Sequence, residues 1–318
     1  MSRLVPPPVP ESPDAVFRSL RKGRPRYGEL VIQGLLLAAA LVSVGTTVGI
    51  VLALIPPTAE FFERVDVGEF FTGTEWTALF SDPSYGVLPL LTATVLITGI
   101  ALLVAIPVGL GAAIYLSEYA APRVRKVLKP VLEVLAGIPT VVYGFFAFAF
   151  ITPLLQDIWP GSAGPEVKNA LAAGLVMGVM IVPTIASLSE DAMSAVPQSL
   201  RDGAFALGSG KRQVAVRVVM PAALSGIIAA FVLGVSRAVG ETMIVLIASG
   251  ARPDFTLDPL REMQTMTAFI AQAASGDVST ASFEYKTIFA VGALLFVLTF
   301  VMNAISIRLV RKYREVYE

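Results

Sequence analysis

The sequence contains neither cysteine nor histidine among its 318 residues. Without cysteine the chain has no disulfide bond, no thiolate nucleophile and no thiolate ligand for a metal ion. Without histidine it lacks the side chain that most often acts as a general base or a zinc ligand. The two absences argue against a membrane-embedded enzyme, and they predict that the chain holds no metal and needs no cofactor.

Charged residues are also scarce. Only 15% of the residues are charged, whereas 55% are hydrophobic, and the formal net charge is zero. Soluble domains carry charge on about a quarter of their residues. The mean hydropathy of +0.74 agrees with this contrast. The composition therefore predicts a membrane protein in place of a soluble domain.

Long apolar runs account for most of the chain. About 20 apolar residues suffice to cross a bilayer as a helix, and six runs reach that length: 30–55, 88–116, 131–155, 169–188, 222–249 and 287–307. The first run is too long for the apolar part of a signal peptide. The proline-rich residues 1–29 predict a disordered tail. We therefore expect an all-α polytopic membrane protein with six transmembrane helices in one domain, residues 30–315.

The charges that are present alternate along the chain. Basic residues dominate the N-terminal tail, the loops at 117–130 and 190–217, and the C-terminal tail, whereas the intervening loops are neutral or acidic. Because loops rich in lysine and arginine stay on the cytoplasmic side, both termini are predicted to lie in the cytoplasm. The expected location is the bacterial cytoplasmic (inner) membrane, crossed several times.

The longest polar interval between two spans, residues 190–221, carries an ordered motif. Its order resembles the EAA loop through which permeases of ABC importers contact their ATPases, with Asp for Glu, Gly for the first Ala, Val for Ile and Met for Leu. The matching positions are Asp202, Gly203, Ala204, Gly208, Val218, Met220 and Pro221. We predict a short cytoplasmic helix over residues 200–210 that docks on an ATPase. The alternative is an ordinary polar loop.

The same interval contains an incomplete phosphate-binding loop. Gly208, Ser209, Gly210 and Lys211 match its last part, but Phe205 stands where the first glycine belongs and Arg212 where Ser or Thr belongs. The chain itself is therefore not expected to hydrolyse ATP, and the energy for transport would come from a partner or an ion gradient.

Arg237 and Glu241 are the candidate substrate residues. Arg237 lies about 12 residues beyond Ser225 in the predicted fifth span, which at about 1.5 Å per residue places it about 18 Å deep, near the bilayer centre. A charge there costs on the order of 3 kcal/mol and requires a reason. The i, i+4 spacing predicts that Arg237 and Glu241 share a helix face and pair. One interpretation is an anion site, with Glu241 holding Arg237 when the site is empty; the other is a structural ion pair between helices.

Pro139 interrupts the predicted third span and predicts a kink. Thr140 and Tyr143 follow it and are further candidates for the pathway, although a packing kink with satisfied hydroxyl groups is the better explanation for each of them alone.

Taken together, the stretches 136–144, 201–221 and 237–242 resemble the PstC-type permease of the bacterial phosphate-specific ABC importer, over residues 30–315. The resemblance implies a type I (MetI-like) permease fold and ATP-driven import of inorganic phosphate by alternating access. It implies a heterodimer with a PstA-type permease, two PstB-type ATPase subunits and a PstS-type phosphate-binding protein. It also implies surrounding membrane lipid and no nucleic acid as a partner. The proline-rich tail lies outside the resemblance.

Two other classes of transporter stay open at this point. A permease for another oxyanion, such as sulfate or molybdate, would keep the ATPase-docking loop and differ around Arg237. An ion-coupled secondary transporter would usually show internal repeats and its own coupling carboxylates, but the sequence shows no convincing repeat and Glu241 is the only carboxylate in the middle of a span.

Overall fold

The computed structural model describes residues 27–80, 82–159, 161, 164–276, 278–279 and 282–312. The chain divides after Ala53 into two units, which are described separately. Of the predicted disordered tail, residues 1–26 lie outside the described residues, and 27–29 already belong to helix α2 (Tyr27–Phe62). The regular structure of the described residues is helical, apart from one isolated bridge between Trp76 and Tyr85.

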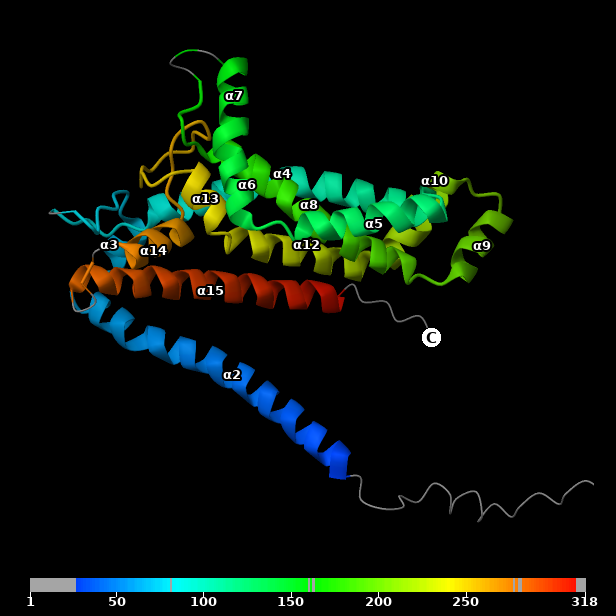
Figure 1. Ribbon diagram of the computed structural model, residues 1–318, viewed down its shortest axis with the longest axis horizontal. Helices are drawn as coiled ribbons and strands as arrows, with labels where there is room; N and C mark the ends of the chain where they lie inside the picture. Colours follow the sequence, from blue (N-terminus) through cyan, green and yellow to red (C-terminus); the bar gives the residue numbers. More distant parts are fainter. Residues whose placement is uncertain are drawn as a thin grey trace, which may run out of the picture. The chain divides into compact units, whose positions relative to one another are not determined.

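The long helices confirm an all-α polytopic membrane protein. Five helical segments among the described residues are long and apolar enough to span a bilayer, and a sixth is added if one bent pair counts as a span. The second unit is built around α4 (Leu88–Ile114), α8 (Ala170–Ser194), α12 (Leu224–Val239) and α15 (Phe283–Lys312). Figure 1 shows α3 (Val67–Thr72) and α14 (Met266–Ser275) at one end of this bundle, and α9 (Gln198–Ala206) and α10 (Lys211–Val214) at the other. These are called the α3 end and the α9 end.

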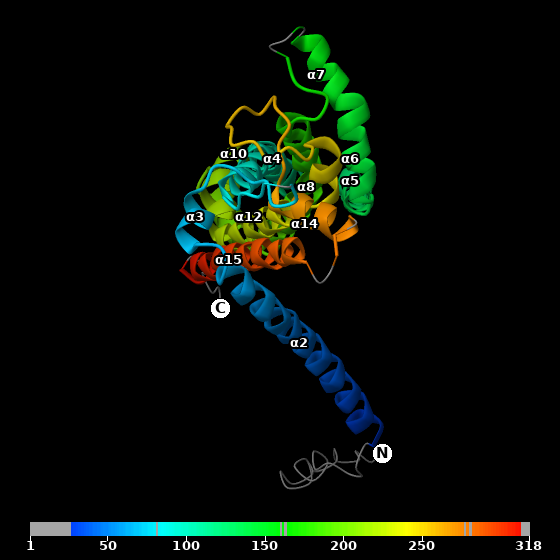
Figure 2. The ribbon, with the colours of Figure 1, turned by 90° about the vertical axis from the view of Figure 1, so that its left-hand side faces the viewer.

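The predicted third span, 131–155, is wrong at its start. Residues Pro122–Ala136 form a separate helix, α5, and the span consists of α6 (Thr140–Phe146), a π-helical turn η2 (Ala147–Ile151) and α7 (Thr152–Ile158). Pro139 has extended backbone (φ −58°, ψ 136°) and lacks the N–H that a continuous helix needs. Figures 1 and 2 agree that α6 and α7 run across the direction of α4 and α8 and project from the bundle.

The predicted fifth span, 222–249, is not one helix either. The helical stretch α10, η3 (Ala215–Val219) and α11 (Met220–Ala222) meets α12 at a bend of 73°. Helix α12 then ends at Val239, and a short helix α13 (Met243–Ala248) begins after three intervening residues. The interval 240–242 is thus an unwound break inside an apolar stretch, and one of the candidate residues, Glu241, lies in it.

Glycines allow α4 and α8 to pack closely. A Cβ atom added to Gly174 of α8 would lie 2.7 Å from Cβ of Ile100, and one added to Gly178 would lie 2.9 Å from Cβ of Val104. Around this contact lies a core that includes Ile97, Met177 and Ile181, each at most 1% exposed. Because lipid supplies no hydrophobic force between helices, such close packing is what holds them together.

This packing predicts the effect of enlarging Gly178. Gly178→Val should destabilise the subunit by about 1–3 kcal/mol, because the new methyl groups overlap α4 and the core is already filled. Gly99→Val is the matched control, since Gly99 is exposed on α4 and an added Cβ meets no atom within 4 Å. Thermal unfolding in detergent should show a lower midpoint only for Gly178→Val. Equal midpoints in the two variants would contradict the close contact.

An aromatic cluster closes the α3 end. Phe61, Phe70, Trp76 and Phe269 are each at most 2% exposed, and Trp76 meets Phe269 edge to face with ring centroids 5.0 Å apart. Helix α14 supplies Phe269, together with Met266 and Ala273, from its buried face. Helix α14 is thus a short amphipathic helix whose buried face belongs to the aromatic cluster.

The same end carries a polar contact between two loops. The carboxylate of Glu166 accepts hydrogen bonds from the backbone N–H of Glu262 at 2.8 Å and from Nη1 of Arg261 at 3.1 Å. The Glu262 N–H is the main cause of a lowered pKa of Glu166, helped by Arg261 and Arg252 and opposed by partial burial. The contact joins the loop before α8 to the loop before α14.

Candidate functional site

Arg237 lies in the last turn of α12, two residues before that helix ends. Its Nη1 donates a hydrogen bond to Oγ1 of Thr184 on α8, at 2.9 Å. Thr184 follows Pro183, which interrupts the hydrogen-bond ladder of α8. The sequence pattern did not single out Thr184, because it is one hydroxyl in an apolar helix and only the packing of α12 on α8 brings it to Arg237.

Glu241 occupies the break between α12 and α13 and is 8% exposed. Its Oε1 accepts hydrogen bonds from the backbone N–H groups of Met243, at 3.0 Å, and Ile244, at 3.2 Å. Its own carbonyl accepts from the Thr267 hydroxyl at 2.7 Å. A carboxylate is a good acceptor for the free N–H groups at the start of a helix. Glu241 therefore caps α13 and holds the break.

The predicted pairing of Arg237 with Glu241 is wrong. No ion pair joins them among the described residues, and the partners of each are different. The i, i+4 rule applies only within a continuous helix, and α12 ends at Val239. Within the described part of the chain, Thr184 is the only hydrogen-bond partner of the Arg237 side chain. Most donors of the guanidinium are therefore left for another acceptor, and a planar guanidinium binds oxyanions with two parallel hydrogen bonds.

Thr140 and Tyr143 lie on α6, which packs against the α13 side of the break. A Cβ atom added to Gly144 of α6 would lie 3.1 Å from Cα of Ile244. Tyr143 is 9% exposed, and its hydroxyl donates to the carbonyl of Leu135 at 2.9 Å. This hydroxyl is satisfied by the preceding helix, as expected for a packing kink. Thr140 is half-buried at the start of α6.

The residues predicted to couple the subunit to an ATPase lie at the α9 end. Helix α9 stops at Ala206 and does not reach the predicted residue 210, because Gly208 has a left-handed backbone (φ 82°). Asp202 is exposed and accepts a hydrogen bond from the Gln198 side chain at 3.0 Å. Gly203 is exposed with open space around it. Pro221 is not in a loop before the next span, since it lies in α11 just ahead of the bend.

Ala204 differs from its neighbours on α9. It is half-buried and packs against an apolar cluster that includes Met193, Val196 and Val214. The surface that α9 leaves open is formed by Gly203, Ala206 and the exposed Phe205 and Leu207. Ala204 thus holds the helix to its own subunit, and the open surface is the part of α9 available to a partner.

Buried ion pairs lie at the α9 end, and no sequence motif predicts them. Arg201, 9% exposed, donates from Nη2 to Oε1 of Glu118 at 3.0 Å. Glu190, at the α9 end of α8, pairs with Arg125 and Lys129 of α5. In the sequence, such contacts could be suspected from a carboxylate just after an apolar run, as at Glu190, together with a basic segment elsewhere, as at 123–129.

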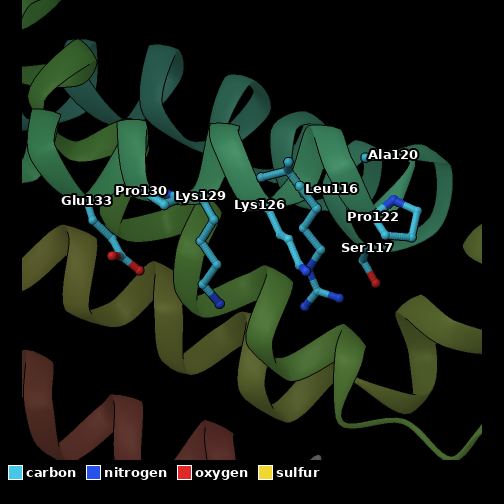
Figure 3. A pocket seen from close by; sticks show the side chains of 9 residues that line it. Leu116, Ser117, Ala120, Pro122, Lys126, Lys129, Pro130 and Glu133 are labelled. Atoms are coloured by element: carbon cyan, nitrogen blue, oxygen red, sulfur yellow. The ribbon is translucent and has the colours of Figure 1, made fainter.

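A pocket of about 620 Å³ lies beside α5 at the same end. Figure 3 shows Lys126, Lys129 and Glu133 on the same side of the helix. The lining residues are Leu116, Ser117, Ala120, Pro122, Arg125, Lys126, Lys129, Pro130 and Glu133. The pocket gives water access to cations whose carboxylate partner, Glu190, is buried.

Comparison with known proteins relates this geometry to a family. Residues 105–315 match the model of the family described as binding-protein-dependent transport system inner membrane component. The chain is 36% identical over 265 residues to the probable ABC transporter permease protein YqgH of Bacillus subtilis, covering 83% of this chain and 84% of that protein. It is 35% identical over 283 residues to the phosphate transport system permease protein PstC 1 of Mycobacterium tuberculosis, covering 78% and 83%.

Solved structures show the same fold. A bacterial ABC transporter that imports alginate aligns with a TM-score of 0.59 at 15% identity, over 92% of this chain and all of the other. The MetNI methionine ABC transporter in an inward-facing conformation aligns with a TM-score of 0.52 at 19% identity, over 72% and 95%. This multi-pass membrane chain, with the type I permease fold of ABC importers, belongs to the family of binding-protein-dependent transport system inner membrane components.

Proposed function

We propose that the chain is the permease subunit of an ATP-driven importer of inorganic phosphate. The observation that carries the proposal is Arg237, a permanent cation inside an apolar stretch whose only hydrogen-bond partner among the described residues is a neutral hydroxyl. A guanidinium matches the geometry of a phosphate oxyanion and stays charged at every physiological pH. The PstC names of relatives at 30–35% identity point to the same substrate.

Partners complete the proposed importer. A PstA-type permease would form the pathway together with this chain, and two PstB-type ATPase subunits would hydrolyse ATP. A PstS-type binding protein would deliver phosphate. We assign the segment that contains Asp202, Gly203, Ala204, Gly208 and Pro221 to ATPase docking. The open face of α9 would form the contact, and Ala204 would hold α9 to its own subunit.

The geometry suggests how the subunit acts. Closure of the ATPases would displace α9 and open the pathway towards the binding protein. Phosphate would then meet Arg237 beside the break at 240–242. Glu241 keeps that break open by capping α13, so that the end of α12 stays free to present the guanidinium. Thr140 and Tyr143 would shape the pathway from α6.

Reconstitution of the assembled complex in vesicles tests the substrate. Radiolabelled phosphate should accumulate on the side of the membrane that carries the ATPases. It should do so only when ATP is present on that side and the binding protein is present on the opposite side. Tenfold excess of sulfate or molybdate should leave the uptake unchanged. Uptake of sulfate or molybdate in place of phosphate would contradict the substrate assignment, and phosphate uptake driven by an ion gradient without ATP would contradict the importer class.

A further inference from the structure

Glu190 is a carboxylate with no solvent exposure at the α9 end of α8. It forms ion pairs with Arg125 and, at 2.8 Å, with Lys129, and Oε1 also accepts from the Ser194 hydroxyl at 2.9 Å. Arg125 reaches the same hydroxyl at 2.9 Å. A fully buried carboxylate such as Glu190 stays charged at low cost only while its cationic partners remain in place. Both cations come from α5.

Helix α5 has no buried residue. It lies alongside α8 at the α9 end in Figure 1, and apolar side chains such as Val127 and Val134 are exposed. Because no α5 side chain is buried, we infer that the ion pairs of Arg125 and Lys129 with Glu190, together with that of Lys129 with Asp191, contribute strongly to the attachment of α5 to α8. An attachment of this kind depends on a few atoms and can be removed without emptying a core.

Helix α9 is attached to the same end of α8. Arg201 donates from Nη1 to the carbonyl of Val196 at 2.6 Å and from Nη2 to the carbonyl of Met193 at 2.8 Å. Met193 is three residues beyond Glu190. The end of α8 therefore holds α9 through Arg201 and α5 through Glu190, within one turn of the helix.

The other end of α5 leads to the candidate pathway. The Tyr143 hydroxyl on α6 donates to the Leu135 carbonyl near the end of α5. Helix α6 in turn packs against α13, which Glu241 caps. A continuous series of contacts thus runs from α9 through the end of α8 and α5 to the break beside Arg237.

We propose that Glu190 is a positioning residue that makes α5 and α9 move as one body, so that displacement of α9 by the ATPases reaches the pathway at α6. The inference rests on the proposed function for the existence of a transport cycle. Glu190 belongs neither to the open face of α9 nor to the anion site, and its buried ion pairs would link the two.

The test replaces the charge and keeps the shape. In Glu190→Gln, phosphate transported per ATP hydrolysed should fall about ten-fold, a size typical of mutations in coupling elements. ATP hydrolysis and the amount of assembled complex should stay at wild-type levels, because Arg125 and Lys129 are 39% and 27% exposed and water can solvate them once released. Asp191→Asn is the matched control: it removes the charge of the adjacent carboxylate, which is 55% exposed and, among the residues that the structure describes, forms an ion pair with Lys129 alone. Its transport ratio should stay within about two-fold of wild type.

A distance measurement separates linkage from general damage. The chain has no cysteine, so Arg123→Cys on α5 and Ser199→Cys on α9, both exposed, can carry spin labels in the intact complex. With and without trapped nucleotide, their separation should stay constant in the wild type and in Asp191→Asn, and change in Glu190→Gln. A constant separation in Glu190→Gln, or loss of ATP hydrolysis and assembly together with transport, would overturn the linkage role. Because the distances do not depend on the substrate, they test Glu190 even if the transported anion is not phosphate.

Discussion

Replacing Arg237 by glutamine is expected to lower phosphate uptake about a hundred-fold, while the complex assembles normally. The physical reason is the loss of two charge-assisted hydrogen bonds to the anion, each contributing about 1.5 kcal/mol, and each 1.4 kcal/mol corresponds to a factor of ten. Arg237→Lys should restore only part of the uptake, because an ammonium group lacks the planar pair of donors. The measurement is uptake by reconstituted vesicles, normalised to assembled complex.

Two comparisons make this result specific. Thr184→Val removes the hydrogen bond that orients Arg237 but leaves the guanidinium in place, so uptake should fall by less than in Arg237→Gln. Because Arg237 and Glu241 have separate partners, the free-energy effects of Arg237→Gln and Glu241→Gln should add in the double variant to within about 0.5 kcal/mol. Wild-type uptake in Arg237→Gln would rule out the anion site. Strong coupling between the two changes would show that they act as an ion pair after all.

Introducing a charge on the open face of α9 should uncouple the subunit from its ATPases. Gly203→Glu is expected to lower phosphate uptake at least about ten-fold, because a bulky desolvated carboxylate at the centre of a contact prevents close approach. The subunit should still fold, since a Cβ atom at Gly203 meets no other atom within 4 Å. The measurements are uptake and the amount of ATPase that copurifies with the subunit.

Gly203→Ala is the control for this position. It adds one methyl group in open space and favours the helix by about 1 kcal/mol, so uptake should equal or exceed that of the wild type. Ala204→Glu should behave differently, with loss of folded subunit, because Ala204 packs against the cluster of Met193 and Val196. Unchanged uptake in Gly203→Glu would exclude the open face of α9 as the docking surface.

The membrane spans follow the apolar runs of the sequence in part. Their number and approximate places follow from apolar runs, because any segment that crosses lipid must satisfy its backbone within a helix and present apolar side chains. The ends of the third and fifth spans could not be predicted from the apolar runs. Residues 131–136 are apolar enough to extend the third span, yet they belong to α5. The unwound stretch 240–242 lies between apolar residues on both sides, so the sequence around it looks like that of a continuous helix.

The candidate site shows the same division. Arg237 stands out in the sequence because a charge deep in an apolar stretch needs a function or a partner. Its partner could not be identified, because the nearest carboxylate along the chain, Glu241, turns to the N–H groups of Met243 and Ile244 once α12 has ended. Thr184 is 53 residues away in sequence and reaches Arg237 only through the packing of two helices.

The amino-acid sequence alone is enough to identify an all-helical, multi-pass permease with one arginine deep in an apolar stretch, and it predicts an ATPase-docking motif in the interval after α8. These are consequences of composition, of the length of apolar runs and of local order, each of which acts on neighbouring residues. The break of α12 before Glu241, the inward orientation of Ala204, and the attachment of α5 and α9 to one end of α8 through Glu190 and Arg201 become visible only in the folded chain. Those outcomes depend on contacts between residues far apart in the chain, where the burial of a charge or a methyl group is settled by the neighbouring helix.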